Sequence, residues 1–109
     1  MLVLTKALGT GIILAAEMRG LAQGMWVDAT LQSMLQSNQK AGQLFQQFQA
    51  TACTDVTGFG LLGHLVEMLK SSDMCATVLL GRLPLLPGVL QVPGMSSSHH
   101  TLSVIAPPV

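Results

Sequence analysis

A single acidic residue stands among threonines and glycines in the stretch TDVTGFGLLGH, which runs from Thr54 to His64. The N–H groups in the first turn of a helix have no intrahelical partners, and together with the helix dipole they favour a bound anion. Glycines such as Gly58 and Gly60 would let a bulky anion approach the backbone closely, because no Cβ intervenes. A carboxylate at Asp55 would repel a phosphate in this place unless a cation lay between the two.

The chemistry that fits this pattern is a magnesium ion held by Asp55 and bound in turn to nucleotide phosphates. Magnesium is commonly bound by one or two protein carboxylates, with waters and substrate phosphates in the other positions. The hydroxyls of Thr54 and Thr57 would add hydrogen-bond donors. The alternative is that Asp55 only caps a helix, which needs no ligand and contributes about 1 kcal/mol. The motif is not a Walker A loop, and GTG near the start of the chain is not a dinucleotide fingerprint.

Two expected elements position this loop. ATACT at 50–54 is expected to form a short strand that ends at Asp55, with Cys53 inside it. After the loop, apolar residues return at helical spacing until SSD at 71–73 ends the pattern; they are Phe59, Leu62, Leu65, Val66 and Leu69.

The chain before this loop is expected to contain one strand and two helices. LVLTK at 2–6 is apolar and β-prone enough for a strand, and LGTG at 8–11 supplies turn residues. Thr10 is expected to cap a first helix, which ends near Gly20 and Gly24 and carries Ile12, Ile13, Ala16, Met18 and Leu21.

Asp28 is expected to cap the second helix, whose apolar stripe recurs at three- and four-residue steps at Leu31, Met34, Leu35, Ala41, Leu44, Phe45 and Phe48. The stripe has one polar member, Asn38. We interpret Asn38 either as a buried side chain bonded to a neighbouring backbone group or as a contact to another domain or a ligand.

The remaining sequence predicts little regular structure. CATVLL at 75–80 is a plausible strand, LPLLPGVLQ at 83–91 a turn followed by at most a short helix, and TLSVI at 101–105 an edge strand. GMSSSHH at 94–100 is loop-like and APPV at 106–109 a tail. The expected fold is α+β, a small mixed sheet with helices packed on one face. We divide the chain into a partial α+β domain at 1–92 and an irregular tail or weak edge strand at 93–109.

The chain is 50% hydrophobic and only 9% charged, against about a quarter charged in typical soluble domains. No signal peptide is visible, and the best candidate for a membrane span, LGTGIILAAEM, is broken by Glu17 and then Arg19. We therefore expect another part of a protein to cover much of this surface. A net charge of zero without a basic cluster argues against DNA and anionic membranes as partners. Cys53 and Cys75 are expected to be reduced and buried.

Four segments in order resemble the selenophosphate synthetase family, also called selenide, water dikinases. They are LTKALGTGI, MLQSNQKAG, ATACTDVTGFGLLGHLVEML and LPLLPGVLQ, and the resemblance covers residues 1 to about 91. The family usually has proline where Ala7 stands. The resemblance implies the C-terminal half of such an enzyme, in the aminoimidazole ribonucleotide synthetase-like superfamily.

This resemblance implies a reaction in which selenide, ATP and water give selenophosphate, AMP and orthophosphate. It also implies an α+β domain that packs against a separate N-terminal domain, with ATP and magnesium ions between them. The full-length enzyme would be a cytoplasmic homodimer. By resemblance, Asp55 matches an aspartate associated with magnesium and nucleotide phosphate, and Lys6 matches a lysine of the family that is either near polyphosphate or only structural.

The resemblance leaves several residues without a role. Asn38 matches a recurrent asparagine of unassigned function, and His64 ends the family motif. The reactive cysteine or selenocysteine of the family and its partner lysine belong to an N-terminal segment that has no match here. Neither Cys53 nor Cys75 lies near basic residues, so we assign no catalytic residue. We expect a fragment truncated at both ends that is inactive alone.

Overall fold

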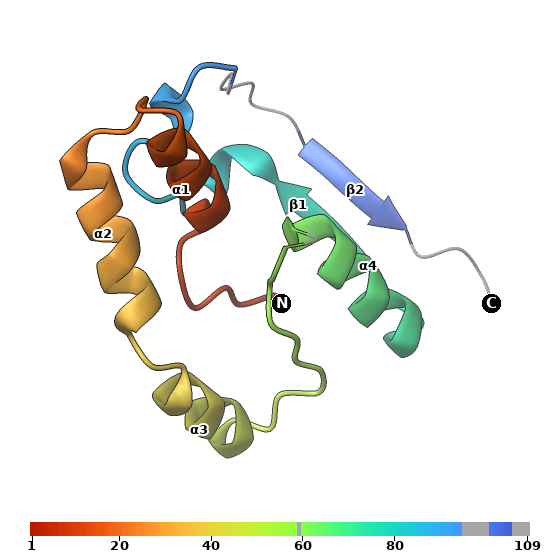
Figure 1. Ribbon diagram of the computed structural model, residues 1–109. Coiled ribbons are helices and arrows are strands. Elements are labelled where there is room, and N and C mark those ends of the chain that lie inside the picture. Colours follow the sequence, from red (N-terminus) through yellow and green to blue (C-terminus); the bar gives the residue numbers. More distant parts are fainter. Residues whose placement is uncertain (59, 95–100, 106–109) are drawn as a thin grey trace.

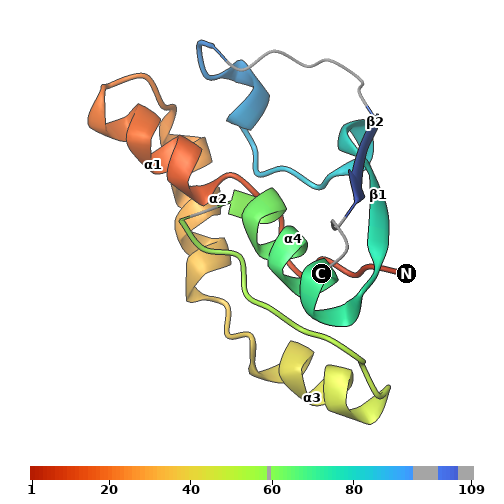
Figure 2. The same ribbon diagram turned by 90° about the vertical axis from the view of Figure 1, so that its right-hand side faces the viewer.

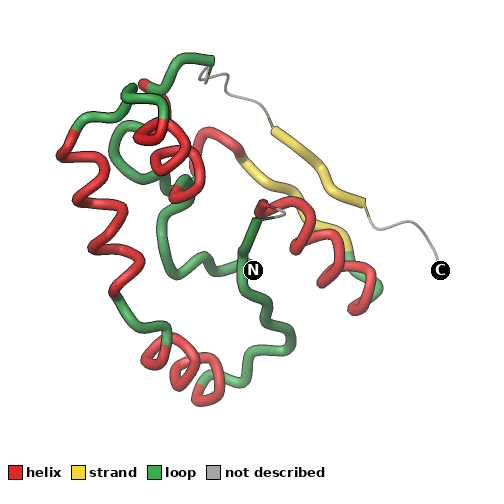
Figure 3. The backbone as a smooth tube through the Cα atoms, viewed as in Figure 1, coloured by secondary structure: helices red, strands yellow, loops and turns green. Residues whose placement is uncertain are grey.

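The computed structural model describes residues 1–58, 60–94 and 101–105, with the backbone alone for the last range. Figures 1 and 3 show a chain of mixed helices and strands, as the α+β prediction requires. In order, its elements are α1 (Thr10–Met18), α2 (Gly24–Leu35), α3 (Gln39–Gln47), α4 (Gly60–Ser72), β1 (Cys75–Leu79), the 3-10 helices η1 (Leu80–Arg82) and η2 (Val89–Gln91), and β2 (Thr101–Ile105).

In the described part of the chain, one of two hydrophobic clusters packs α4 against β1. β1 pairs with β2 in antiparallel register from Cys75 opposite Ile105 to Leu79 opposite Thr101, which confirms the strands expected at 75–80 and 101–105. The i,i+4 pair Leu65 and Leu69 faces inward and packs with Val78 of β1. The mixed sheet predicted from the sequence is not formed by the described residues, in which this sheet has two antiparallel strands and α4 as the helix packed on it.

The other hydrophobic cluster packs α1, α2 and the loop around η2 together. Its buried residues are Ile13, Leu86 and Val89, with Trp26 among the half-buried side chains packed on them. Gly88 has a φ of 91°, and a Cβ there would collide with the Trp26 ring, so this close packing requires glycine. The turn and short helix predicted for 83–91 are confirmed.

Much apolar surface stays exposed because the two clusters are small and separate. The accessible surface is 8223 Å², whereas a compact monomer of this length exposes about 5,800 Å². The radius of gyration is 15.4 Å against about 13 Å for a compact domain. Figure 2 shows α3 far from the strands, and α3 has no buried residue. An exposed apolar surface of this kind is typical of an interface, and its cover by another polypeptide stays a prediction.

Two predicted strands are absent. Residues 2–6 and 50–54 both follow irregular paths, so the strands expected in these two segments are wrong. Their β-prone side chains are not sufficient, because a strand needs a hydrogen-bonding neighbour. Among the described residues, the nearest strand-like pairing to residues 2–6 is an isolated parallel bridge between Leu8 and Leu85.

The long helix predicted around Asn38 is divided into α2 and α3. The Ser37 hydroxyl accepts the N–H of Gln39 at 3.1 Å, a local bond that competes with helix continuation. Asn38 is exposed at the start of α3, which contradicts its interpretation as a buried residue.

The predicted helix caps are displaced. α2 begins four residues before Asp28, which therefore lies inside the helix. Gly9, at a φ of 118°, occupies the cap position predicted for Thr10, and Leu21 lies beyond the end of α1. The prediction for Phe59 and those for 95–100 and 106–109 fall outside the described residues. In the part of the chain that is described, no helix is long and apolar enough to cross a membrane.

Candidate functional site

The loop from Thr54 to Gly60 leads into α4, as the sequence predicts. Gly60 starts the helix at a φ of 76°, and its N–H donates to the carbonyl of Thr57 at 2.9 Å. This left-handed conformation favours glycine, so Gly60 has a structural reason to be there. At both Gly58 and Gly60, a Cβ would meet no atom within 4 Å. The loop therefore keeps open space beside its backbone.

Asp55 lies in this loop and is exposed. Among the described residues, its carboxylate makes no hydrogen bond or ion pair, and it lies five residues before the first residue of α4. Its backbone carbonyl accepts the Thr54 hydroxyl at 3.2 Å. The carboxylate is thus available to a ligand, and the alternative that it caps the helix finds no hydrogen bond in support.

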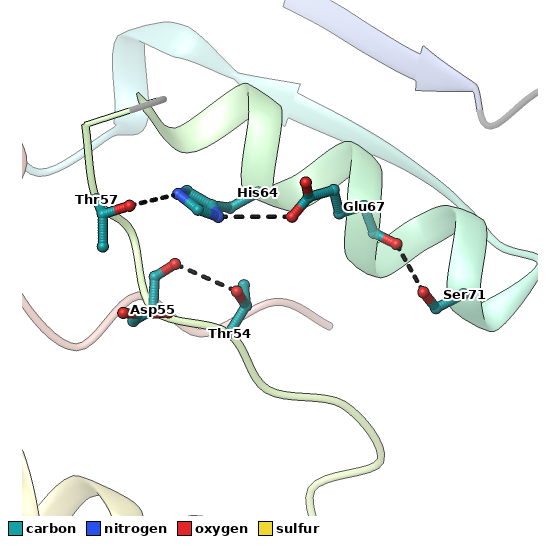
Figure 4. A network of polar contacts seen from close by, with 6 residues as sticks. All are labelled: Thr54, Asp55, Thr57, His64, Glu67 and Ser71. Atoms are coloured by element: carbon teal, nitrogen blue, oxygen red, sulfur yellow. Dashed lines mark hydrogen bonds and ion pairs between the residues drawn. The ribbon is translucent and has the colours of Figure 1, made fainter.

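Thr57 connects the loop to α4 through a polar network (Figure 4). Its Oγ1 lies 2.9 Å from His64 Nε2, and His64 Nδ1 lies 3.7 Å from Glu67 Oε2. One turn further along, the Ser71 hydroxyl donates to the backbone carbonyl of Glu67 at 3.0 Å. Glu67 was not among the site residues expected from the sequence, although His64 and Glu67 have the i,i+3 spacing that brings side chains together on a helix.

An open cavity of about 280 Å³ separates the loop from α4. It is polar on both sides, since Thr54 lines it from the loop and Glu67 from the helix. Its full lining is Ala52, Cys53, Thr54, Glu67, Met68, Ser71 and Ser72. The cavity shows that the side of the loop occupied by Thr54 is accessible to small molecules.

Lys6 contacts α2. Its ammonium donates to the carbonyl oxygens of Ser33 at 2.8 Å and Gln36 at 2.5 Å. These carbonyls lie in the last turn of α2 and at the residue that follows it, where helix geometry leaves acceptors unpaired and the dipole favours a cation. Lys6 therefore has a structural function at the break between α2 and α3.

Both cysteines are free and exposed. The prediction that they are buried is wrong, because Cys53 lies in a loop and Cys75 lies at an exposed position of β1.

The donors of the loop suit magnesium better than a soft metal. They are carboxylate, hydroxyl and carbonyl oxygens, which hard cations prefer. No group of three or more histidine, cysteine or acidic side chains that could hold a metal occurs within 1–58, 60–94 and 101–105. The arrangement fits a cation held by one protein carboxylate and completed by waters or phosphates, and the space beside Gly58 and Gly60 leaves room for them.

Comparison with known proteins identifies the family of the chain. Residues 1–105 match the family "AIR synthase related protein, C-terminal domain". The chain is similar to proteins named selenide, water dikinase. The chain is 32% identical to the protein of this name from Clostridioides difficile, and the match covers 86% of this chain and 27% of that protein. It is 42% identical to the Geobacter metallireducens protein, over 81% of this chain and 26% of that protein. It is also 42% identical to the Myxococcus xanthus protein, over 87% of this chain and 27% of that protein.

These matches extend over a limited part of the relatives. The chain spans about a quarter of the length of the curated proteins it matches. No solved structure matches it.

Proposed function

The chain belongs to the AIR synthase related protein, C-terminal domain family, and we propose on this basis that it is part of an ATP-dependent selenophosphate synthetase. In the reaction that the resemblance implies, selenide, ATP and water give selenophosphate, AMP and phosphate. This chain would contribute magnesium and ATP-phosphate binding. The supporting observation is the Asp55 carboxylate, which is exposed and has no partner among the described residues. It lies beside a glycine-opened helix start, within a chain that resembles proteins of that name.

Each residue of the loop has a distinct proposed task. Asp55 would hold the cation, and the open backbone at Gly58 and Gly60 would let phosphate oxygens approach. Thr54 and Thr57 would supply hydroxyl contacts. Magnesium, when bound, would neutralise charge on the phosphates as the phosphoryl group is transferred.

Lys6 stays a predicted phosphate contact. Its ammonium has three donors, and two of them are used by the carbonyls of Ser33 and Gln36. A phosphate contact would use the third donor and leave the end of α2 capped.

The proposed partners are the N-terminal domain of the same enzyme and, in the full-length protein, a second copy. The exposed apolar side chains of α2 and α3, including Leu35 and Phe48, give the first partner a surface to cover. By the same resemblance, we propose the cytoplasm as the location of the enzyme. Because catalysis would need the N-terminal reactive residue and lysine, we expect this chain alone to release no AMP from ATP and selenide above background.

A calorimetric titration with ATP in the presence of magnesium tests the binding proposal. We expect weak binding that Asp55→Asn reduces at least tenfold and that disappears without magnesium. Asp28→Asn, on the exposed side of α2, is the matched control and should bind like the wild type. Equal binding by Asp55→Asn and wild type would refute the assigned role of Asp55.

A non-catalytic structural piece is the second candidate, and the two small separate cores favour it. A chain that depends on a partner for much of its stability would hold the fold together without binding nucleotide. Absence of heat at millimolar Mg–ATP, with the chain shown to be folded by circular dichroism, would select this candidate. A related ATP-dependent enzyme of the same superfamily is a third candidate; the relatives named selenide, water dikinase argue against it.

A further inference from the structure

The polar network of Figure 4 places an imidazole between a hydroxyl and a carboxylate. His64 is close to buried, with 12% of its side chain exposed, whereas the Glu67 side chain is 79% exposed. Thr57 Oγ1 faces Nε2 at 2.9 Å, which is hydrogen-bond distance. Glu67 Oε2 faces Nδ1 at 3.7 Å, which is longer than a hydrogen bond but close enough for the charge to act on the ring.

The Glu67 carboxylate favours one placement of the protons on this ring. An ionised carboxylate only accepts hydrogen bonds, so Glu67 favours the tautomer with its proton on Nδ1. The neutral ring then carries its lone pair on Nε2. In this tautomer the Thr57 hydroxyl donates its proton to Nε2, and the lone pairs of its oxygen are left for other partners.

We propose that His64 and Glu67 are positioning residues that fix the Thr57 hydroxyl as an acceptor toward any ligand of the loop. A hydroxyl whose proton is already used suits a divalent cation or a cation-bound water, and does not suit a phosphate oxygen, which needs a donor. The proposal therefore gives Thr57 a task on the cation side of the site, beside Asp55. Only the identity of the ligand rests on the proposed function; the hydroxyl orientation does not.

The orientation is tested without any ligand by NMR of the His64 ring nitrogens in alkaline buffer, where imidazoles are neutral. We expect the Nδ1–H tautomer, a shift of the Nε2 resonance in Thr57→Val, and a larger fraction of the other tautomer in Glu67→Ala. Thr54→Val, whose hydroxyl bonds to Asp55 O instead, is the control and should leave His64 unchanged. A dominant Nε2–H tautomer, or a His64 spectrum that Thr57→Val does not alter, would overturn the proposal.

A double-mutant cycle tests whether His64 acts through Thr57 when Mg–ATP binds. Removing an outer partner of a metal site typically weakens metal binding 10- to 100-fold. We expect His64→Ala and Thr57→Val each to weaken Mg–ATP binding about tenfold. The double variant should lose less than about twofold more than either single variant. His64→Gln should recover part of the binding, because its amide oxygen can accept a hydrogen bond from Thr57. A double variant whose loss of binding equals the product of the two single losses would overturn the proposal. If the wild type binds no Mg–ATP, the proposed function fails, while the ligand-free spectra still decide the orientation of Thr57.

Discussion

Asp55 is the residue on which the binding proposal depends, and its surroundings explain why a ligand is expected there. An acidic side chain at the entrance of a helix usually finds a backbone donor. In the described residues Asp55 finds none, and the glycines near it keep their sides open. A carboxylate in that position is ready to bind a cation without breaking an existing contact.

At Gly60 the backbone conformation itself can be tested. Alanine at a φ of 76° is strained by about 1–2 kcal/mol, so Gly60→Ala should lower the free energy of unfolding by about that amount. Gly42→Ala is a matched control inside α3, where a Cβ has open space and helix propensity predicts stabilisation by about 0.5–1 kcal/mol. Urea denaturation measures both. Equal shifts for the two variants would contradict the strained conformation at Gly60.

The contacts of Lys6 with the end of α2 can be tested by their effect on stability. Lys6→Met removes two charge-assisted hydrogen bonds to the last turn of α2, and because the site is partly exposed we expect a loss of about 1–2 kcal/mol in unfolding free energy. Lys40→Met, on the exposed side of α3, should change stability by less than about 0.5 kcal/mol. If Lys6→Met is as stable as the control, the capping role is wrong.

Among the elements, α4 positions the site because it is anchored to β1 on one face and carries His64 and Glu67. Leu65 and Leu69 are buried one turn apart, and this pair holds the helix against Val78. The loop before Gly60 has no buried residue of its own in the part described, so its position depends on this helix.

The anchoring of α4 predicts unequal effects along one helix. Leu65→Ala should destabilise the chain by about 2–4 kcal/mol, because it removes a buried side chain from a small cluster. Leu62→Ala, at a position that is 41% exposed, should cost less than about 1 kcal/mol. Thermal unfolding followed by circular dichroism compares them, and similar midpoints for the two variants would show that α4 is not packed as described.

How far the sequence determines these elements differs from one to another. The helix after the motif, the strand at 75–80 and the strand at 101–105 follow from patterns within each segment, and they formed. The strands at 2–6 and 50–54 did not, because pairing depends on a neighbour that a single segment does not encode. The Asp55 loop was predicted from its glycines and its carboxylate, whereas the Thr57–His64–Glu67 contacts depend on how the loop folds back on α4, and only their i,i+3 part is readable in the sequence.

The molecule as a whole exposes more surface to solvent than a compact monomer of the same length. Two clusters without a shared core cannot bury the stripe of α2 and α3, so Leu35 is 79% and Phe48 76% exposed. Such a surface is typical of an interface. The chain matches only about a quarter of the length of its relatives. We propose that the remainder of the enzyme covers this exposed apolar surface.

This exposure predicts association of the isolated chain. Sedimentation velocity should show concentration-dependent oligomers, and Leu35→Gln with Phe48→Gln should shift the chain toward monomer, because the two substitutions remove exposed apolar area. The paired change Gln32→Asn with Gln46→Asn, at exposed polar positions of α2 and α3, serves as the control. A wild-type chain that stays monomeric at high concentration would contradict the proposed interface.

The most direct measurement of the central claim replaces magnesium by paramagnetic manganese, bound with ATP, and follows NMR signals along the chain. Divalent manganese accepts the same oxygen ligands and broadens the resonances of nearby nuclei. We predict that the amides of residues 54–58 and 60 broaden first and that Asp55→Asn abolishes the effect. Broadening centred elsewhere, or unchanged by Asp55→Asn, would contradict a cation held at Asp55 between this loop and a nucleotide phosphate.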